Sequence, residues 1–276
     1  MIPASFDYQR ASSVDEAIGL LSGAGEDAKL LAGGHSLLPL MKLRLASPSL
    51  LVDIAGIQEL SYVRQSGDHL AIGSLTRHAD LSRSEAALHE APLLAHVAGQ
   101  IGDPQVRHRG TIGGSIAHGD PASDLPAACL ALDASFVVAS PRGERNIAAA
   151  DFFRGFLETE LASDEVLVEI IVPTAAGAGW SFQKFNRRAQ DWAIVGVAAV
   201  SNGSTRIGLV NMGPTPVRAI GVEQALGQGA SVTEAAQHAS DGLDPPADLN
   251  ASPEYRRHLA TVLVGRALEE AAQKKA

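Results

Sequence analysis

Apolar and polar positions alternate along the chain with two different periods. Between Val14 and Leu21 apolar residues recur every three or four positions, which predicts an amphipathic helix that starts at a Ser13–Glu16 capping box and ends at Gly25. Short apolar runs bounded by turn residues predict strands at residues 28–32, 50–54, 69–73, 135–139 and 165–172. Helical patterns lie between them at residues 76–83, 91–100 and 127–132. This alternation indicates an α/β or α+β fold.

The pattern changes after Pro173. Residues 174–179 are rich in glycine and alanine and form the best linker candidate, so we expect two domains, at residues 1–176 and 177–276. Apolar runs beyond the linker predict a small antiparallel sheet at residues 180–185, 193–200 and 205–212. Three helices follow, at residues 219–226, 231–240 and 253–274. The last should begin after a Ser252 cap and bury Tyr255, Leu259, Val262 and Leu263.

Composition narrows the class of protein. The 276 residues carry 22 Lys and Arg against 31 Asp and Glu, a net charge of -9, which disfavours binding to nucleic acid or to anionic membranes. The single cysteine, Cys129, excludes an internal disulfide, a four-thiolate cluster and a cysteine zinc site built by this chain alone. The amino terminus lacks a signal-peptide pattern, and no apolar run reaches the length of a membrane span. A soluble cytoplasmic protein is expected.

One glycine motif is misleading. Residues 23–28, Gly-Ala-Gly-Glu-Asp-Ala, match the letters of the dinucleotide fingerprint G-x-G-x-x-A. That fingerprint needs a strand before it and a helix after it, whereas here a helix precedes and a strand follows. We therefore do not expect a nucleotide at this position, and the chain has no Walker motif either.

Two other glycine clusters have a favourable context. Gly33-Gly34-His35-Ser36 follows a predicted strand, and Thr111-Ile112-Gly113-Gly114-Ser115 precedes a predicted helix. Paired glycines allow successive backbone N–H groups to line one concavity, so two such loops could grip a diphosphate with few cationic side chains. The spacing alone leaves open that these glycines only form tight turns.

Other catalytic chemistry has weaker support. The histidines lack metal-ligand spacing, so a metal site is not expected, and Cys129 falls within an apolar helix where it reads as a small hydrophobic residue. The cluster Arg107-His108-Arg109 either steers a diphosphate towards the second glycine cluster or is a solvated loop.

Four strings of the sequence carry one resemblance: Leu-Ala-Gly-Gly-His-Ser-Leu at residues 31–37, Gly-Asp-Pro-Gln-Val-Arg at 102–107, Gly-Thr-Ile-Gly-Gly-Ser at 110–115 and Asp-Pro-Ala-Ser-Asp-Leu-Pro at 120–126. Together they resemble the FAD-binding medium subunits of molybdenum hydroxylases, and most of all the carbon monoxide dehydrogenase medium-subunit type. The resemblance extends over essentially the whole chain. It implies an α+β fold: a PCMH-type, vanillyl-alcohol-oxidase-like FAD domain of two subdomains, then the family's carboxy-terminal flavoprotein domain with a small antiparallel sheet and three helices.

The resemblance also implies a set of cofactor-binding residues for non-covalent FAD. The diphosphate would lie against Ala32, Gly33, Gly34, His35 and Ser36 and against Thr111, Ile112, Gly113, Gly114 and Ser115. Asp124 would accept hydrogen bonds from the ribose or ribityl part, Lys184 would lie near the isoalloxazine, and Trp192 near one flavin face. The remaining cofactor-binding positions are Ile101 and Leu167. Ser115 departs from the usual asparagine, and with Cys129 alone the chain cannot hold the iron–sulfur cluster that some relatives carry in this subunit.

The function implied by the resemblance is electron transfer within a heteromeric complex. A large subunit would hold the molybdenum cofactor, a small subunit would hold [2Fe-2S] clusters, and FAD in this chain would pass electrons to an external acceptor such as a quinone, NAD or oxygen. A dimer of heterotrimers is implied, and no residue of this chain is expected to act on the organic substrate. The alternatives are a self-sufficient flavin oxidase and a non-enzymatic acidic α+β binding module.

Overall fold

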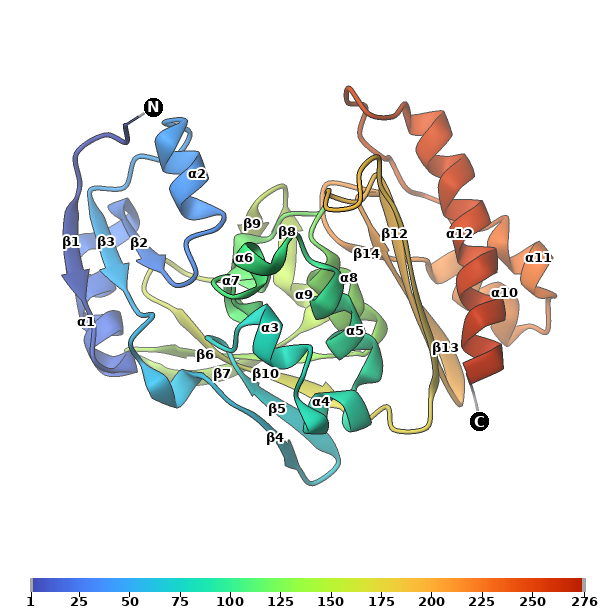
Figure 1. The fold of residues 1–276 in the computed structure, drawn as a ribbon, viewed down its shortest axis with the longest axis horizontal. Coiled ribbons are helices and arrows are strands. Elements are labelled where there is room, and N and C mark those ends of the chain that lie inside the picture. Colours follow the sequence, from blue (N-terminus) through green and yellow to red (C-terminus); the bar gives the residue numbers. More distant parts are fainter. Residues whose placement is uncertain (1, 275–276) are drawn as a thin grey trace.

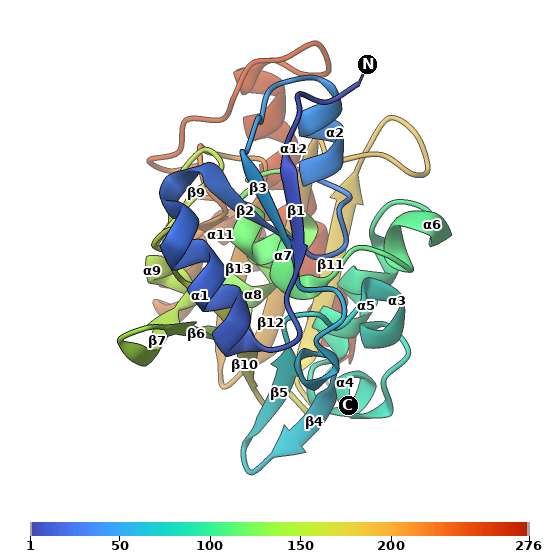
Figure 2. The ribbon, with the colours of Figure 1, turned by 90° about the vertical axis from the view of Figure 1, so that its left-hand side faces the viewer.

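The computed structural model describes residues 2–274, which form three units side by side (Figure 1). The first unit is a small parallel sheet in the order β1-β3-β2, flanked by α1 and α2 (Figure 2). Its elements are β1 (Asp7–Arg10), α1 (Val14–Ala24), β2 (Ala28–Leu31), α2 (Leu37–Lys42) and β3 (Leu50–Asp53). Apolar residues of α1 and of β3 share one core, which fixes α1 on the sheet.

The second unit is a five-stranded antiparallel sheet in the order β4-β5-β10-β6-β7. Its strands are β4 (Val63–Ser66), β5 (His69–Gly73), β6 (Ser135–Ser140), β7 (Gly143–Ala148) and β10 (Val166–Pro173). Its helices are α3 (His78–Leu81), α4 (Glu85–Glu90), α5 (Pro92–Gln100), α6 (Pro104–Arg107), α7 (Ile112–His118), α8 (Asp124–Ala131) and α9 (Ala149–Phe152). A two-stranded hairpin, β8 (Phe153–Gly155) and β9 (Glu158–Thr159), completes it.

A β-bulge in the central strand β10 changes which side chains face each side of this sheet. The register of β10 against β6 shifts between Leu167 and Glu169. Val166 and Val168 face the core that includes α1, whereas Leu167 and Ile170 face the core that includes α5 and α8. Because a bulge inserts one extra residue, Leu167 and Ile170 lie on the same face although they are three positions apart.

The third unit is an antiparallel sheet in the order β11-β12-β13-β14 that stands between α8 and α12 (Figure 1). Its strands are β11 (Gly179–Phe185), β12 (Val195–Asn202), β13 (Ser204–Val210) and β14 (Val217–Arg218). Its helices are α10 (Ile220–Gly227), α11 (Val232–Ala236) and α12 (Pro253–Lys274). Ala198 and Val200 face the core shared with α8, while Val197 and Ala199 face the core shared with α12. Burial on both sides explains why this strand reads as a continuous apolar run.

The structure confirms the expected α+β architecture and corrects several details. The buried face of α12 includes Arg256, Leu259 and Leu263, whereas Tyr255 is 43% exposed, so the predicted face was wrong by about one position at its start. The capping box of α1 is incomplete: Ser13 accepts from the Glu16 N–H as expected, but the Glu16 carboxylate bonds to the N–H of Ser12.

Strand β1 was missed because all four of its residues are exposed and polar or aromatic, so the chain gives no apolar signal there. It is recognisable only through its parallel pairing with β3. Within residues 2–274 no helix is both long enough and apolar enough to cross a bilayer.

Candidate functional site

The first glycine cluster forms the loop between β2 and α2, and it packs directly on the segment that leads into the second cluster. A Cβ on Gly33 would lie 2.3 Å from the carbonyl oxygen of Arg109 and 2.8 Å from the Cα of Gly110. Only glycine permits this approach of two backbones. The fold therefore brings together two motifs that lie far apart in the sequence.

The N–H groups of the first cluster are free. Within residues 2–274, the backbone N–H groups of Gly33, Gly34, His35 and Ser36 donate no hydrogen bond, although the Gly34 carbonyl accepts from the N–H of Leu38 at 3.1 Å. Gly34 has a φ of +75°, a conformation that side chains rarely adopt. A run of unpaired donors beside a glycine in this conformation suits the oxygens of an anionic ligand.

The second cluster is built differently, which corrects an expectation. Its glycines do not lie in a loop; they form the first turn of α7, with Thr111 as the N-cap. The N–H of Gly113 donates to the Ser74 carbonyl at 2.9 Å, and that of Gly114 donates to the Thr111 hydroxyl at 3.1 Å. The N–H groups of Ile112 and Ser115 are likewise bonded within the protein. The prediction of a second set of free backbone donors is therefore wrong for residues 112–115.

Asp124 and Lys184 form a buried ion pair between the second and third units. The Lys184 ammonium lies 2.6 Å from Oδ2 of Asp124, and their side chains are only 12% and 6% exposed. Burial raises the pKa of the Asp124 carboxyl, while Lys184 acts in the opposite direction. The other oxygen, Oδ1, is buried and accepts no hydrogen bond from the described residues. An orphaned buried acceptor of this kind calls for a donor from outside the chain.

Ile101 lies close to this pair. Lys184 also donates to the Gln100 carbonyl at 3.5 Å, at the end of α5 where Ile101 follows. Ile101 is partly buried, and its carbonyl accepts from the Arg107 guanidinium at 2.9 Å. Leu167 is buried in the sheet core beneath the helices. Contacts therefore link the first glycine cluster to residues 109–110, and Lys184 to both Gln100 and Asp124.

Two further buried polar atoms near the glycine clusters were not expected. The hydroxyl of Ser74 and Nδ1 of His78 have no hydrogen-bond partner among the described residues. Ser74 packs against Gly113, and His78 packs against Gly110. Burial lowers the pKa of His78 to about 4, so its ring is neutral near pH 7. The sequence patterns gave no role to Ser74, and His78 was considered only within the general exclusion of a histidine metal site.

Two residues of the cluster Arg107-His108-Arg109 bond to backbone carbonyls of their own loop. Arg107 donates to the carbonyls of Ile101 and Gly102, and Nδ1 of His108 lies 2.8 Å from the Pro104 carbonyl oxygen. Cys129 is fully buried in α8, and burial raises the pKa of its thiol to about 12, which confirms its interpretation as a small hydrophobic residue.

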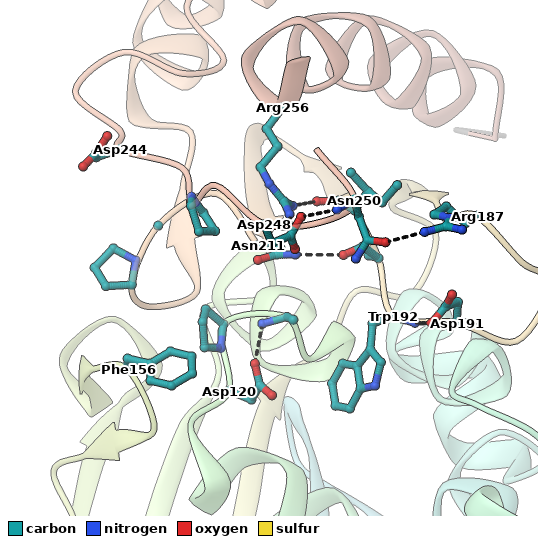
Figure 3. Close-up of a pocket in the computed structure, with 17 residues that line it drawn as sticks. Asp120, Phe156, Arg187, Asp191, Trp192, Asn211, Asp244, Asp248, Asn250 and Arg256 are labelled. Atoms are coloured by element: carbon teal, nitrogen blue, oxygen red, sulfur yellow. Dashed lines mark hydrogen bonds and ion pairs between the residues drawn. The ribbon is translucent and has the colours of Figure 1, made fainter. Parts of the chain in front are cut away.

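Trp192 lies in the loop between β11 and β12. Its indole is 57% exposed and lines a cavity of about 750 Å³ (Figure 3). Asp120 and Pro121, in the loop that leads into Asp124, line the same cavity, as does Phe156 from the hairpin. The volume is in the range of small-molecule sites.

Two family models and several known proteins match almost the whole chain. Residues 4–175 match the family described as "FAD binding domain in molybdopterin dehydrogenase", and residues 180–271 match the "CO dehydrogenase flavoprotein C-terminal domain". The carbon monoxide dehydrogenase medium chain of Hydrogenophaga pseudoflava is 46% identical, over 98% of both chains. A 6-hydroxypseudooxynicotine dehydrogenase complex subunit alpha of Paenarthrobacter nicotinovorans is 39% identical, over 98% of this chain and 96% of the relative.

Solved structures of similar fold lead to the same family. Carbon monoxide dehydrogenase from Hydrogenophaga pseudoflava superimposes with a TM-score of 0.96 at 46% identity, covering 100% of both chains. Quinoline 2-oxidoreductase from Pseudomonas putida 86 gives 0.92 at 32% identity, again over the full length of both chains. These relatives are oxidoreductases. The chain therefore belongs to the family of FAD-binding medium subunits of molybdenum hydroxylases.

Proposed function

We propose that this chain is the electron-transfer subunit of a heteromeric molybdenum hydroxylase. It holds FAD non-covalently between the [2Fe-2S] clusters of a small partner subunit and an external acceptor, while a large partner carries the molybdenum cofactor and acts on the organic substrate. One observation carries the proposal: among the residues that the family resemblance singles out, four backbone N–H groups at residues 33–36 and the buried Oδ1 of Asp124 have no partner within the described residues. FAD carries phosphate oxygens that can accept hydrogen bonds from these N–H groups, and sugar hydroxyls that can donate one to Oδ1 of Asp124.

Each group of residues makes a different kind of contact with FAD in this proposal. The N–H groups of residues 33–36 hold the diphosphate, with Ala32 and residues 111–115 packed beside them. Asp124 accepts a hydrogen bond from a ribose or ribityl hydroxyl through Oδ1 and, through Oδ2, keeps the Lys184 ammonium near the isoalloxazine. Ile101 and Leu167 supply apolar contacts, and Trp192 covers one flavin face. When bound, FAD supplies the ability to take up electrons singly and release them singly or in pairs.

The same proposal includes the organisation of the chain and its complex. We place the boundary between the FAD domain and the carboxy-terminal domain at 176/177, in the segment that joins β10 to β11. The linker is tied down by the Ala175 N–H, which donates to the Glu90 carbonyl at 2.6 Å. A dimer of heterotrimers in the cytoplasm is the assembly we infer from the family.

Asp124→Ala tests the site. Removing the carboxylate leaves a hydroxyl of FAD without its acceptor, so FAD affinity should fall at least about tenfold, the lower bound for a hydrogen bond to a charged group. The measurement is a titration of the deflavinated complex with FAD. Asp133→Ala is the matched control, because Asp133 lies just beyond the other end of α8 and also pairs with the third unit, through Arg206 and Arg218. Equal FAD affinity in both variants would remove Asp124 from the site.

A spectrum and a metal analysis of the purified complex test the assignment itself. We expect about one flavin per chain, together with iron and molybdenum in copurified subunits. Flavin without those metals would support a self-sufficient oxidase. Absence of flavin after incubation of the complex with FAD would support a binding module.

A further inference from the structure

The loop at residues 186–194 carries Trp192, and side chains from distant parts of the third unit hold it in place. Asn211, just after β13, donates through Nδ2 to the Ala193 carbonyl at 2.9 Å. Arg256, on α12, donates to the Ile194 carbonyl. Arg187, in the loop itself, donates to Oδ1 of Asn250 at 3.0 Å. The backbone on the carboxyl side of Trp192 is therefore held from two elements that are remote in sequence.

Arg256 is an unusual member of the apolar face of α12. Its side chain is fully buried, at 0% exposure, on a face otherwise made of leucine, valine and alanine. Burial of a guanidinium is unfavourable unless its N–H groups find partners, and a well-packed apolar residue often stabilises such a position better. The arginine is therefore hard to explain as a contribution to stability alone.

The hydrogen-bond partners of Arg256 account for its buried position. Besides the Ile194 carbonyl, it contacts Oδ2 of Asp248 at 2.7 Å. Oδ1 of Asp248 accepts from the N–H groups of Asn250 and Ala251, which closes the loop ahead of α12. Both partner segments line the cavity that holds Trp192, and Figure 3 shows the Arg256 side chain extending from its helix towards Asp248. A single planar guanidinium thus ties two cavity loops to one rigid helix.

We propose that Arg256 is a positioning residue for Trp192: it holds the loop on which the indole is mounted and so keeps the aromatic face at a fixed place beside the loop leading to Asp124. This inference rests on the proposed function in one respect, since it takes Trp192 to lie against bound flavin. It assigns to the carboxy-terminal helix, which is remote in sequence from the glycine clusters, control over the environment of the flavin ring.

Fluorescence of the bound flavin tests the inference in the purified complex. A stacked indole quenches flavin emission, so Trp192→Ala should raise it at equal flavin content. Arg256→Leu should raise it towards the same level, and the double variant should add little to Trp192→Ala alone, because Arg256 acts through Trp192. Arg257→Leu is the control: Arg257 is the next residue on α12, is 38% exposed and contacts Asp244 of the same loop at 3.6 Å. It should leave the emission unchanged.

A second variant keeps the test decisive if Arg256→Leu fails to fold. Asn211→Gly removes the amide that holds the Ala193 carbonyl, yet glycine keeps both the φ of +62° and the N–H bonded to Pro121. It should raise the emission in the same direction.

The outcomes separate this inference from the proposed function. If the wild-type complex binds no flavin, the proposed function fails. If flavin binds and Trp192→Ala leaves its emission unchanged, or if Trp192→Ala raises it while folded Arg256→Leu and Asn211→Gly do not, the role of Arg256 is refuted and the flavin site stands.

Discussion

The two Gly-Gly pairs of this protein are identical in sequence, but they differ in whether the backbone N–H groups around them are bonded within the protein. Gly33 and Gly34 lie in a loop whose N–H groups are free, and the second of them adopts a positive φ. Gly113 and Gly114 lie in the first turn of a helix whose N–H groups are all bonded within the protein. A Cβ on Gly113 would lie 2.5 Å from the Cβ of Ser74, so this glycine is required by packing.

This comparison shows that a glycine pair in a sequence indicates a close approach of the backbone to another group. The pair does not indicate whether that group is a ligand or another part of the same chain. In the first pair the backbone leaves its donors open to a ligand. In the second, the carbonyls of Ser74 and Thr76, just after β5, and the Thr111 cap accept the hydrogen bonds, and Gly113 allows α7 to pack closely against Ser74. Substitutions in the first pair should therefore act mainly on cofactor binding, and those in the second mainly on stability.

Gly34→Val should have the largest effect, complete loss of bound FAD with a largely intact fold. A β-branched residue at a φ of +75° is strained by roughly 1–2 kcal/mol, and its Cβ would lie 2.9 Å from the Leu38 side chain. The loop would have to rebuild, which removes the row of free N–H groups. Flavin content per chain and a circular dichroism spectrum measure the two quantities. Gly34→Asn, which tolerates this conformation better, should retain more flavin; full flavin content in both variants would contradict the role of this loop.

Gly113→Val should lower the free energy of unfolding by about 1–3 kcal/mol, the usual cost of overpacking. The reason is that the Ser74 Cβ and carbonyl oxygen stand 2.5 and 2.6 Å from the position of the new Cβ. Denaturant unfolding measures the change. Gly19→Ala in α1 is the control, since nothing lies within 4 Å of its Cβ and alanine favours a helix. If both variants unfold at the same denaturant concentration as wild type, the packing role of Gly113 is wrong.

His78, which packs against Gly110 ahead of the second pair, should make stability depend on pH. Its folded pKa of about 4 lies below the ordinary 6.5, so between these values the unfolded chain binds more protons. Stability is therefore complete above pH 6.5 and falls by about 1.4 kcal/mol per pH unit as pH drops towards 4. Unfolding measured from pH 7 to 5 in wild type and in His78→Gln isolates this contribution; parallel profiles would refute it.

Gly114→Ala should have the smallest effect. A Cβ there would meet only the Thr111 hydroxyl, at 2.9 Å, while alanine gains up to about 1 kcal/mol of helix propensity. We expect the free energy of unfolding to change by less than about 1 kcal/mol in either direction. Flavin content sharpens the comparison: if it falls without a change in stability, this glycine also lies against the cofactor, and the two pairs are more alike than their hydrogen bonds indicate.

Much of the fold could be predicted from local patterns, and the failures have a common cause. The bounds of α12 follow from its cap, its proline and its periodic apolar residues, and the apolar run of β12 indicates a strand buried on both faces. Strand β1 was missed because it buries no side chain, and Arg256 was missed because a charged residue does not indicate a core position. In both cases the stabilising partner lies elsewhere in the chain, in β3 or in the loop at Asp248.

The candidate site was likewise predictable only in part. The sequence by itself singled out two glycine clusters whose backbone could approach a diphosphate, and the resemblance to a known family added Asp124, Lys184 and Trp192 as expected contacts. Only the tertiary structure decided which N–H groups stay free, that Asp124 pairs with Lys184 across two domains and keeps one oxygen unbonded, and that α12 holds the loop of Trp192. The physical reason is that whether a polar group is satisfied depends on every neighbour within hydrogen-bond reach, and those neighbours come from remote parts of the chain.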